Sequence, residues 1–371
     1  MEPPNKSCVF TYEPLPHDPR RPPIPYVAGF ETLLTAHTPP PPLGPYNTKR
    51  GEGREEASED ETEHFTHSEW CLRHPPEGAL VVDNPSPKAM RLLEQLSCPC
   101  CAGPKVFRCV LGDSENKTFA AKIYDPLYYM FPGDVSYWAD VDYSVEAGAY
   151  EVIRDAGLDG RYTPKYHGSW AMQVPFSAQI TRTVCLVLME DLKGVTMHTL
   201  LQKNLYIRIP PTQRLDILAE IFEIYRKLQF AGVLHQDLAP RNIILMNLNL
   251  NHYTPPRVVV FDFNIASILN RPTSKYPRVP GTRPMSPMYM YWISPPTNFG
   301  RWVPEPYCSQ PATWRGWAYK RWYHSKEFGD IKEAREAFCR DLEVEWPIEF
   351  AEPLPDALSD EEDTPNYESG E

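Results

Sequence analysis

The chain has 371 residues, 42 prolines and a formal net charge of -12. Prolines at about twice their usual share of ~5% indicate long stretches that are neither helix nor central strand. The excess of acids lies mainly in residues 52–63 and 352–371, and nucleic-acid binding is disfavoured because phosphate contacts need clustered Lys and Arg.

Hydrophobic patterning also restricts the class of protein. No apolar run approaches the ~20 residues that a membrane helix needs, and residues 1–10 lack the pattern of a secretory signal. The nine cysteines are an odd number, and without a secretory context they favour reduced thiols. We therefore expect a cytoplasmic or nuclear protein with no membrane and no nucleic acid among its partners.

The N-terminal quarter of the chain differs in composition from the part that follows. Residues 1–87 contain the run Pro39–Pro42, an acidic run and few sustained apolar patterns. We expect this region to be disordered, because it has too little apolar surface to offset the entropy of ordering, although Tyr26–Leu34 could still dock. Regular patterning continues over residues 88–350, and residues 351–371 are expected to form an acidic disordered tail.

Residues 88–192 have the pattern of a small β-sheet that carries one helix. The helix is predicted over Tyr143–Ala156, where apolar residues fall on one face. The strands predicted to pair are Val106–Leu111 with Thr118–Tyr124 and Tyr166–Met172 with Thr183–Met189.

Residues 193–350 change to mainly helical patterning. Thr212–Phe230 has apolar residues at i, i+3 and i+4 spacing, and Thr212 is a plausible N-cap. A second amphipathic helix is predicted near Glu327–Leu342. The sequence therefore predicts an α+β protein in which a β-rich lobe is followed by a reduced, mainly helical lobe.

The strongest chemical signal lies in the segment His-Gln-Asp-Leu-Ala-Pro-Arg-Asn, which begins at His235. Phosphoryl transfer needs a carboxylate near the attacking hydroxyl and oxygen ligands for Mg²⁺. Asp237 and Asn242 lie five residues apart in this segment, and Asp262 follows an apolar run. Any one of these residues could be a turn or cap residue, but together they supply the groups that this chemistry requires.

These motifs resemble the catalytic and metal-binding motifs of the eukaryotic-type protein kinase superfamily, in a divergent form similar to kinase-like proteins of fungi. The resemblance covers roughly residues 88–350 and implies a two-lobed protein-kinase-like fold that binds ATP and Mg²⁺. It implies that Asp237 is the base that orients the acceptor hydroxyl. It also implies that Asn242 and Asp262 are Mg²⁺ ligands, and that His235 is a structural support.

Further upstream, the resemblance implies the residues that bind the nucleotide. The Ala-Ala-Lys sequence ending at Lys122 resembles the strand whose lysine binds the α and β phosphates. Glu146 is the implied carboxylate partner of this lysine, with Glu151 as the alternative. The strand that ends near Met189 resembles the one leading into the hinge, where backbone groups of Glu190 and Leu192 would contact the adenine.

Three features depart from the family pattern. Residues 95–106 lack Gly-x-Gly-x-x-Gly, Asn264 stands where protein kinases usually have Gly, and residues 281–287 lack Ala-Pro-Glu. The leading expectation is transfer of the γ-phosphoryl group of ATP to a hydroxyl of a protein or small molecule. The alternatives are a pseudokinase that acts as a binding scaffold and a small-molecule kinase.

Overall fold

The computed structural model of the protein describes residues 18–49, 53–80, 86–98, 102–112, 117–130, 132–251, 254–269, 271, 274 and 281–329. The described residues form two compact units. The first contains those up to Met197 and those from Ala231 to Arg278, and the second contains the remainder. The architecture mixes α and β structure, and none of the described helices is both long and apolar enough to cross a bilayer.

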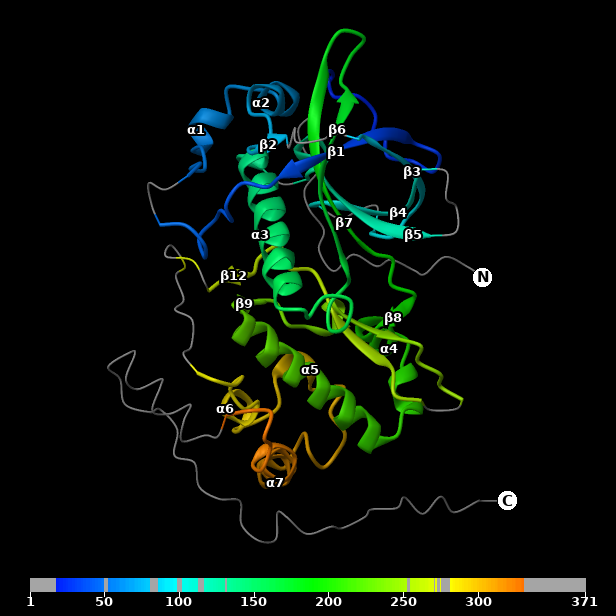
Figure 1. Ribbon diagram of the computed structural model, residues 1–371, viewed down its shortest axis with the longest axis vertical. Helices are drawn as coiled ribbons and strands as arrows, with labels where there is room; N and C mark the ends of the chain where they lie inside the picture. The colour runs from blue at the N-terminus through cyan, green and yellow to red at the C-terminus, as the bar shows by residue number, and fades with distance from the viewer. Residues whose placement is uncertain are drawn as a thin grey trace. The chain divides into compact units, whose positions relative to one another are not determined.

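A closed β-barrel forms the centre of the first unit (Figure 1). Its strands follow the order β1-β3-β4-β5-β7-β6, and β6 pairs back with β1 to close the ring. Each neighbouring pair is antiparallel. The strands are β1 (Glu31–Thr38), β3 (Lys88–Gln95), β4 (Lys105–Leu111), β5 (Thr118–Tyr124), β6 (Tyr166–Pro175) and β7 (Thr181–Glu190). The short β2 (Ala79–Leu80) pairs with β1 outside this ring.

The alternation of side chains along a strand explains both the core of the barrel and the position of its charged residues. In β5, Phe119, Ala121 and Ile123 belong to the apolar cluster inside the barrel. Lys122 and Tyr124 therefore project from the other face, where helix α3 (Val135–Asp155) lies against the barrel (Figure 1).

The hairpins predicted from the sequence are present as β4–β5 and β6–β7. The small sheet predicted for this part did not include β1, which pairs with both β3 and β6 and so leaves these strands without free edges. The predicted disorder of residues 1–87 is accordingly wrong for 18–49 and 53–80. This segment has too few apolar residues for a core of its own, but Tyr26 and Leu34 are buried in the barrel's core.

Two short helices, α1 (Glu59–Thr62) and α2 (His67–Arg73), follow β1. Trp70 of α2 packs in a second apolar cluster with Leu127 of the 3₁₀ helix η1 (Pro126–Tyr128) and with Val135 of α3. Its indole Nε1 donates to Asp134 Oδ1 at 2.8 Å. This region is therefore attached to the N-terminal end of α3.

Helix α3 begins two turns earlier than the sequence predicts. Its N-cap is Asp134, whose carboxylate accepts from the backbone N–H of Tyr137 at 2.9 Å. The predicted start at Tyr143 placed Asp140 outside the helix. In the structure Asp140 is buried and accepts from the Arg54 guanidinium at 2.5 Å.

Short strands position the polar segments of the first unit. Strands β8 (Gly194–Thr196), β10 (Ile243–Met246) and β11 (Arg257–Val260) form one sheet, and β9 (Val233–Leu234) pairs with β12 (Ser267–Ile268). The 3₁₀ helix η3 (Pro240–Asn242) directly precedes β10. The loop between β9 and β10 and the segment after β11 contain the polar residues singled out in the sequence.

The second unit is mainly helical. Its long helix α5 runs over Pro211–Ala231, so Thr212 lies in the first turn and not at the N-cap. Phe222 of α5 stacks on Tyr291 with ring centroids 3.8 Å apart, within a cluster of aromatic side chains. The other elements are α4 (Met197–Gln202), which starts at the boundary of the units, η2 (Leu205–Arg208), α6 (Met288–Tyr291), η4 (Thr297–Phe299) and α7 (Pro311–Trp322). Residues 330–371, with most of the predicted second helix and the whole predicted tail, lie outside the described residues.

Candidate functional site

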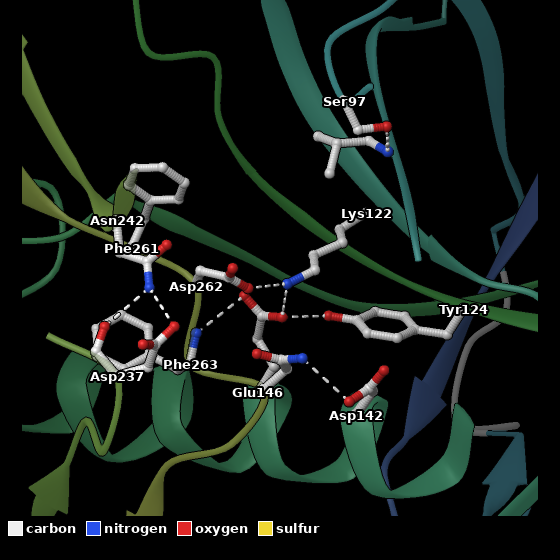
Figure 2. A network of polar contacts seen from close by, with 12 residues as sticks. Ser97, Lys122, Tyr124, Asp142, Glu146, Asp237, Asn242, Phe261, Asp262 and Phe263 are labelled. Carbon is white, nitrogen blue, oxygen red and sulfur yellow. Dashed lines mark hydrogen bonds and ion pairs between the residues drawn. The ribbon is translucent and has the colours of Figure 1, made fainter. Parts of the chain in front are cut away.

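Lys122 lies at the centre of a group of charged side chains within the first unit. Figure 2 shows its ammonium between the carboxylates of Glu146 and Asp262. The Nζ atom donates to Asp262 Oδ1 at 2.6 Å and to Glu146 Oε2. Glu146 projects from the middle of α3, and Glu151, the alternative considered from the sequence, is not the residue that contacts Lys122.

Tyr124 completes the surroundings of Glu146. Its hydroxyl donates to Glu146 Oε2 at 2.6 Å, and the backbone N–H of Phe263 donates to Oε1 at 3.4 Å. Sequence reasoning missed Tyr124, although the period of two in a strand places residues 122 and 124 on the same face. The Glu146 carboxylate is therefore held by contacts from strand β5 and from the segment after β11.

The electrostatics of this group favour a fixed ion pair. Burial alone would lower the pKa of Lys122, but Asp262 and Glu146 outweigh it, so the pKa is raised and the ammonium stays charged. Burial would raise the pKa of Asp262, and the Lys122 ammonium more than offsets this, so that the pKa is lowered. Burial prevails at Glu146, whose pKa is raised even though Lys122 opposes it. The side chain of Lys122 is 8% exposed and that of Asp262 is 36% exposed, so Asp262 is the more accessible member.

The loop between β9 and β10 brings Asp237 and Asn242 together. Asn242 Nδ2 donates to Asp237 Oδ2 at 2.8 Å and to the Asp237 backbone oxygen at 2.9 Å. These bonds orient the Asn242 amide nitrogen toward Asp237, as Figure 2 shows. Asp237 Oδ1 forms an ion pair with Arg241, whose side chain is 55% exposed.

His235 supports this loop through hydrogen bonds of both ring nitrogens, which define its tautomer. The Asp237 backbone N–H donates to His235 Nδ1 at 3.2 Å, so the ring proton is on Nε2, which donates to the Phe261 carbonyl at 3.0 Å. Burial lowers the pKa of His235, which keeps the ring neutral. The histidine therefore joins the loop of Asp237 to the residue that precedes Asp262.

The backbone around Asp262 is in an unusual conformation. Asp262 has φ of +71°, in the left-handed region that non-glycine residues seldom adopt. The next residue, Phe263, is fully buried and packs against Tyr150 of α3 and His235, with ring centroids 5.3 and 4.8 Å away. Phe263 therefore anchors the segment after β11 both to α3 and to the loop that begins at His235.

The predicted hinge residues Glu190 and Leu192 lie at the end of β7 and just beyond it. The Glu190 carboxylate pairs with both terminal nitrogens of Arg257 at 2.7 and 2.9 Å, so this side chain connects β7 to β11. Its backbone N–H donates to the Lys165 carbonyl at 2.9 Å. Leu192 is partly buried just beyond the strand. Contact of their backbones with an adenine stays a prediction.

Two of the three departures from the kinase motifs have structural counterparts. In the loop between β3 and β4, the Ala102 carbonyl accepts from the Met130 backbone N–H at 2.7 Å, which attaches this end of the loop near η1. The Asn264 side chain donates to Asp142 of α3 at 3.1 Å. Sequence reasoning missed Asp142 because it lies just before the predicted helix start. Burial raises the pKa of Asp142 to about 7, although Lys122 opposes the shift.

The donor atoms are suited to Mg²⁺ shared with a phosphate ligand. Among the described residues no three His, Cys, Asp or Glu side chains gather as a metal site. Asp262 offers a partly exposed carboxylate, and Asn242 has an amide oxygen on the side opposite its Asp237 contact. Mg²⁺ is commonly held by one or two side-chain oxygens with phosphates and waters completing its shell, so this small donor set fits.

Comparison with known proteins gives matches only among solved structures. No family model matches the chain, and no curated protein matches it. The chain is similar to the kinase domain of PknI from Mycobacterium tuberculosis, with 18% identity and a TM-score of 0.34 over 48% of this chain and 60% of that chain. It is also similar to the BubR1 kinase domain, with 12% identity and a TM-score of 0.33 over 53% and 51%. WaaP in complex with acyl carrier protein matches with 18% identity and a TM-score of 0.29 over 45% and 59%.

These similarities are weak in both sequence and structure. The matched part spans about three fifths of the PknI kinase domain. Any function of this chain must therefore follow from its own side chains.

Proposed function

We propose that the protein is a kinase-like phosphotransferase that uses ATP and Mg²⁺ and transfers the γ-phosphoryl group to a hydroxyl acceptor. The observation that carries this proposal is the contact of Lys122 with both Glu146 and Asp262, in the same unit as the bonded pair Asp237 and Asn242. The arrangement supplies a fixed cation, two possible oxygen ligands and a further carboxylate. Catalysis of phosphoryl transfer depends mainly on such positioning and charge neutralisation.

Each residue has a defined role in this proposal. Lys122, held by Glu146, would contact phosphate oxygens, while Asp262 and Asn242 would hold Mg²⁺. When bound, the metal ion would neutralise charge on the phosphates. The acceptor oxygen bonds to the γ-phosphorus as the bond to the bridging oxygen breaks, ADP leaves, and Asp237 accepts the hydroxyl proton.

Asp237 must first be released from one of its present contacts. Its Oδ1 atom is paired with Arg241, and its Oδ2 atom accepts from Asn242. Arg241 is the more exposed partner, and exposed ion pairs contribute only ~0–1 kcal/mol. Rotation of Arg241 into solvent would therefore free Oδ1 at little cost.

A nucleotide-binding scaffold without catalysis is the second candidate. The observation that favours it is the composition of the loop between β3 and β4. This loop has Gly103 in place of a glycine-rich run, and the next residue, Pro104, has no N–H to donate to a phosphate. Its attachment through the Ala102 carbonyl also limits its freedom to cover phosphates. Binding and turnover must therefore be measured separately.

The test uses the full chain and three Asp→Asn substitutions. At ~100 times its dissociation constant, Mg-ATP should add about 2.7 kcal/mol to wild-type stability. Asp262→Asn should remove most of this gain. Asp237→Asn should keep nucleotide affinity within a few-fold and lower turnover by ~10²-fold or more, because its side chain acts on the acceptor. The control Asp155→Asn, at a side chain that is 69% exposed, should change neither quantity.

The outcomes separate the candidates. Equal stabilisation of wild type and Asp262→Asn by Mg-ATP would contradict the metal assignment. The same residual ATP consumption in wild type and Asp237→Asn, with peptides and with small-molecule alcohols, would favour the scaffold. Turnover that depends on Asp237 only with small-molecule alcohols would identify a small-molecule kinase.

A further inference from the structure

Asp142 is a carboxylate of α3 for which the proposed reaction has no direct use. It lies four residues before Glu146, so both side chains are on the same face of the helix. Figure 2 shows both projecting from α3 into the polar network. A second acidic group this close to Lys122 and Asp262 needs an explanation.

The contacts of Asp142 fix its orientation. Its Oδ2 atom accepts from the hydroxyl of Tyr129 at 3.1 Å, and Tyr129 is 1% exposed. Its Oδ1 atom accepts from Asn264 Nδ2 at 3.1 Å. The side chain therefore connects a rigid tyrosine on one side to the segment after β11 on the other.

Asn264 is two residues beyond Asp262, whose backbone needs external support. A non-glycine residue in the left-handed region costs about 1 kcal/mol or more and persists only where neighbouring structure fixes it. Besides the packing of Phe263 on Tyr150, two hydrogen bonds to α3 do this for the Asp262–Asn264 segment. One runs from the Phe263 backbone to Glu146, and the other from Asn264 to Asp142.

We propose that Asp142 is a positioning residue that, through Asn264, holds the Asp262–Asn264 segment on α3 with the Asp262 carboxylate facing Lys122. A glycine at position 264, as in the family pattern that the sequence resembles, has no side chain to make this contact. The asparagine therefore adds a second hydrogen bond to α3 and presets the segment before any ligand binds. That this attachment strengthens Mg²⁺ binding rests on the proposed function, whereas the attachment itself does not.

The first experiment tests this attachment without a ligand, by hydrogen exchange of the full chain. Asp142→Leu removes both acceptor atoms at similar volume, and Asn264→Ala removes the donor. Each should speed exchange of a peptide spanning residues 258–266 by about 3- to 10-fold, since a hydrogen bond contributes ~0.5–1.5 kcal/mol. The double variant should exchange no faster than Asp142→Leu alone. Asp142→Asn, which keeps one acceptor oxygen, and the control Glu151→Gln should stay near wild type.

The second measurement asks whether the attachment serves the metal-binding residue. The Mg²⁺ concentration for half-maximal nucleotide binding should rise about fivefold in Asp142→Leu and Asn264→Ala. Affinity at saturating Mg²⁺ should stay within twofold of wild type. A merely structural role would not separate these two quantities.

The proposal is overturned if exchange of residues 258–266 is unchanged in both single variants. It is also overturned if exchange of β7 rises by the same factor, because this would indicate general destabilisation. Should wild type bind no Mg-ATP, the proposed function fails, while the exchange data still decide whether Asp142 holds the segment.

Discussion

Strand β1 offers the sharpest test of the fold, because two adjacent leucines in it face opposite ways. Leu34 is 0% exposed and belongs to the core of the barrel, whereas Leu33 is 59% exposed. The backbone of Leu34 lies in register with Lys88 of β3 and Met172 of β6. Replacing either leucine by alanine makes the same chemical change in two different environments.

The expected free energies differ several-fold. Leu→Ala at a buried site costs ~2–5 kcal/mol, from lost apolar transfer and the cavity that remains. Because Leu34 is completely buried at the closure of the barrel, we expect about 3–4 kcal/mol for Leu34→Ala. Leu33→Ala should stay within ~0.5 kcal/mol, as exposed substitutions usually do. For a unit of this size, the first value lowers the melting temperature by roughly 6–15 °C.

The assay must report on the barrel, since two units can unfold in separate transitions. Hydrogen exchange of a β7 peptide, followed during urea unfolding of the full chain, measures the stability of the barrel directly. Circular dichroism then shows whether the overall transition moves with it. Equal effects of Leu34→Ala and Leu33→Ala would refute the placement of β1 in the barrel.

Three further predictions follow from the same contacts. Deleting residues 1–87 removes β1 and exposes the edges of β3 and β6, so cooperative unfolding of the barrel by circular dichroism should be lost. Burial raises the pKa of Asp140 from 3.8 to about 7, so the folded state binds a proton that the unfolded state has released between about pH 4 and pH 7. The free energy of unfolding should therefore fall over this window, and urea titrations at pH 5 and pH 8 should show a smaller fall in Asp140→Asn. In calorimetric titrations with Mg-ATP, Glu146→Gln should weaken binding about tenfold, because the paired ammonium loses its charged partner, whereas Glu151→Gln should stay within twofold.

The parts of the fold that sequence could predict are those set by local periodicity. The β run Thr118–Tyr124, next to a turn-rich link, placed Lys122 on a strand, and the helical pattern over Tyr143–Ala156 placed Glu146 on α3. Both patterns act over a few residues, so they are readable without the rest of the chain. The five-residue spacing of Asp237 and Asn242 is likewise a property of one loop.

The features that sequence could not predict depend on contacts between distant segments. Leu34 lies in a short apolar stretch of a region rich in Pro and acids, and its burial becomes possible only when strands β3 and β6 are present on either side. Asp142 lies just before the predicted helix and was not singled out, because its two partners, Tyr129 and Asn264, are 13 and 122 residues away. Disorder was predicted from local composition, which does not register a core that is shared with later strands.

The N-terminal segment also bears on the geometry of the candidate site. Arg54 donates to Asp140, which lies six residues before Glu146 on α3. The side chain of Asn47 donates to and accepts from the backbone at β12 at 2.9 and 2.8 Å, a few residues beyond Asp262. Glu146 and Asp262, the two carboxylates that contact Lys122, thus lie on or near elements that form hydrogen bonds with the N-terminal segment. The smallest part of the chain that could preserve this site must therefore extend well upstream of the motifs by which it is recognised.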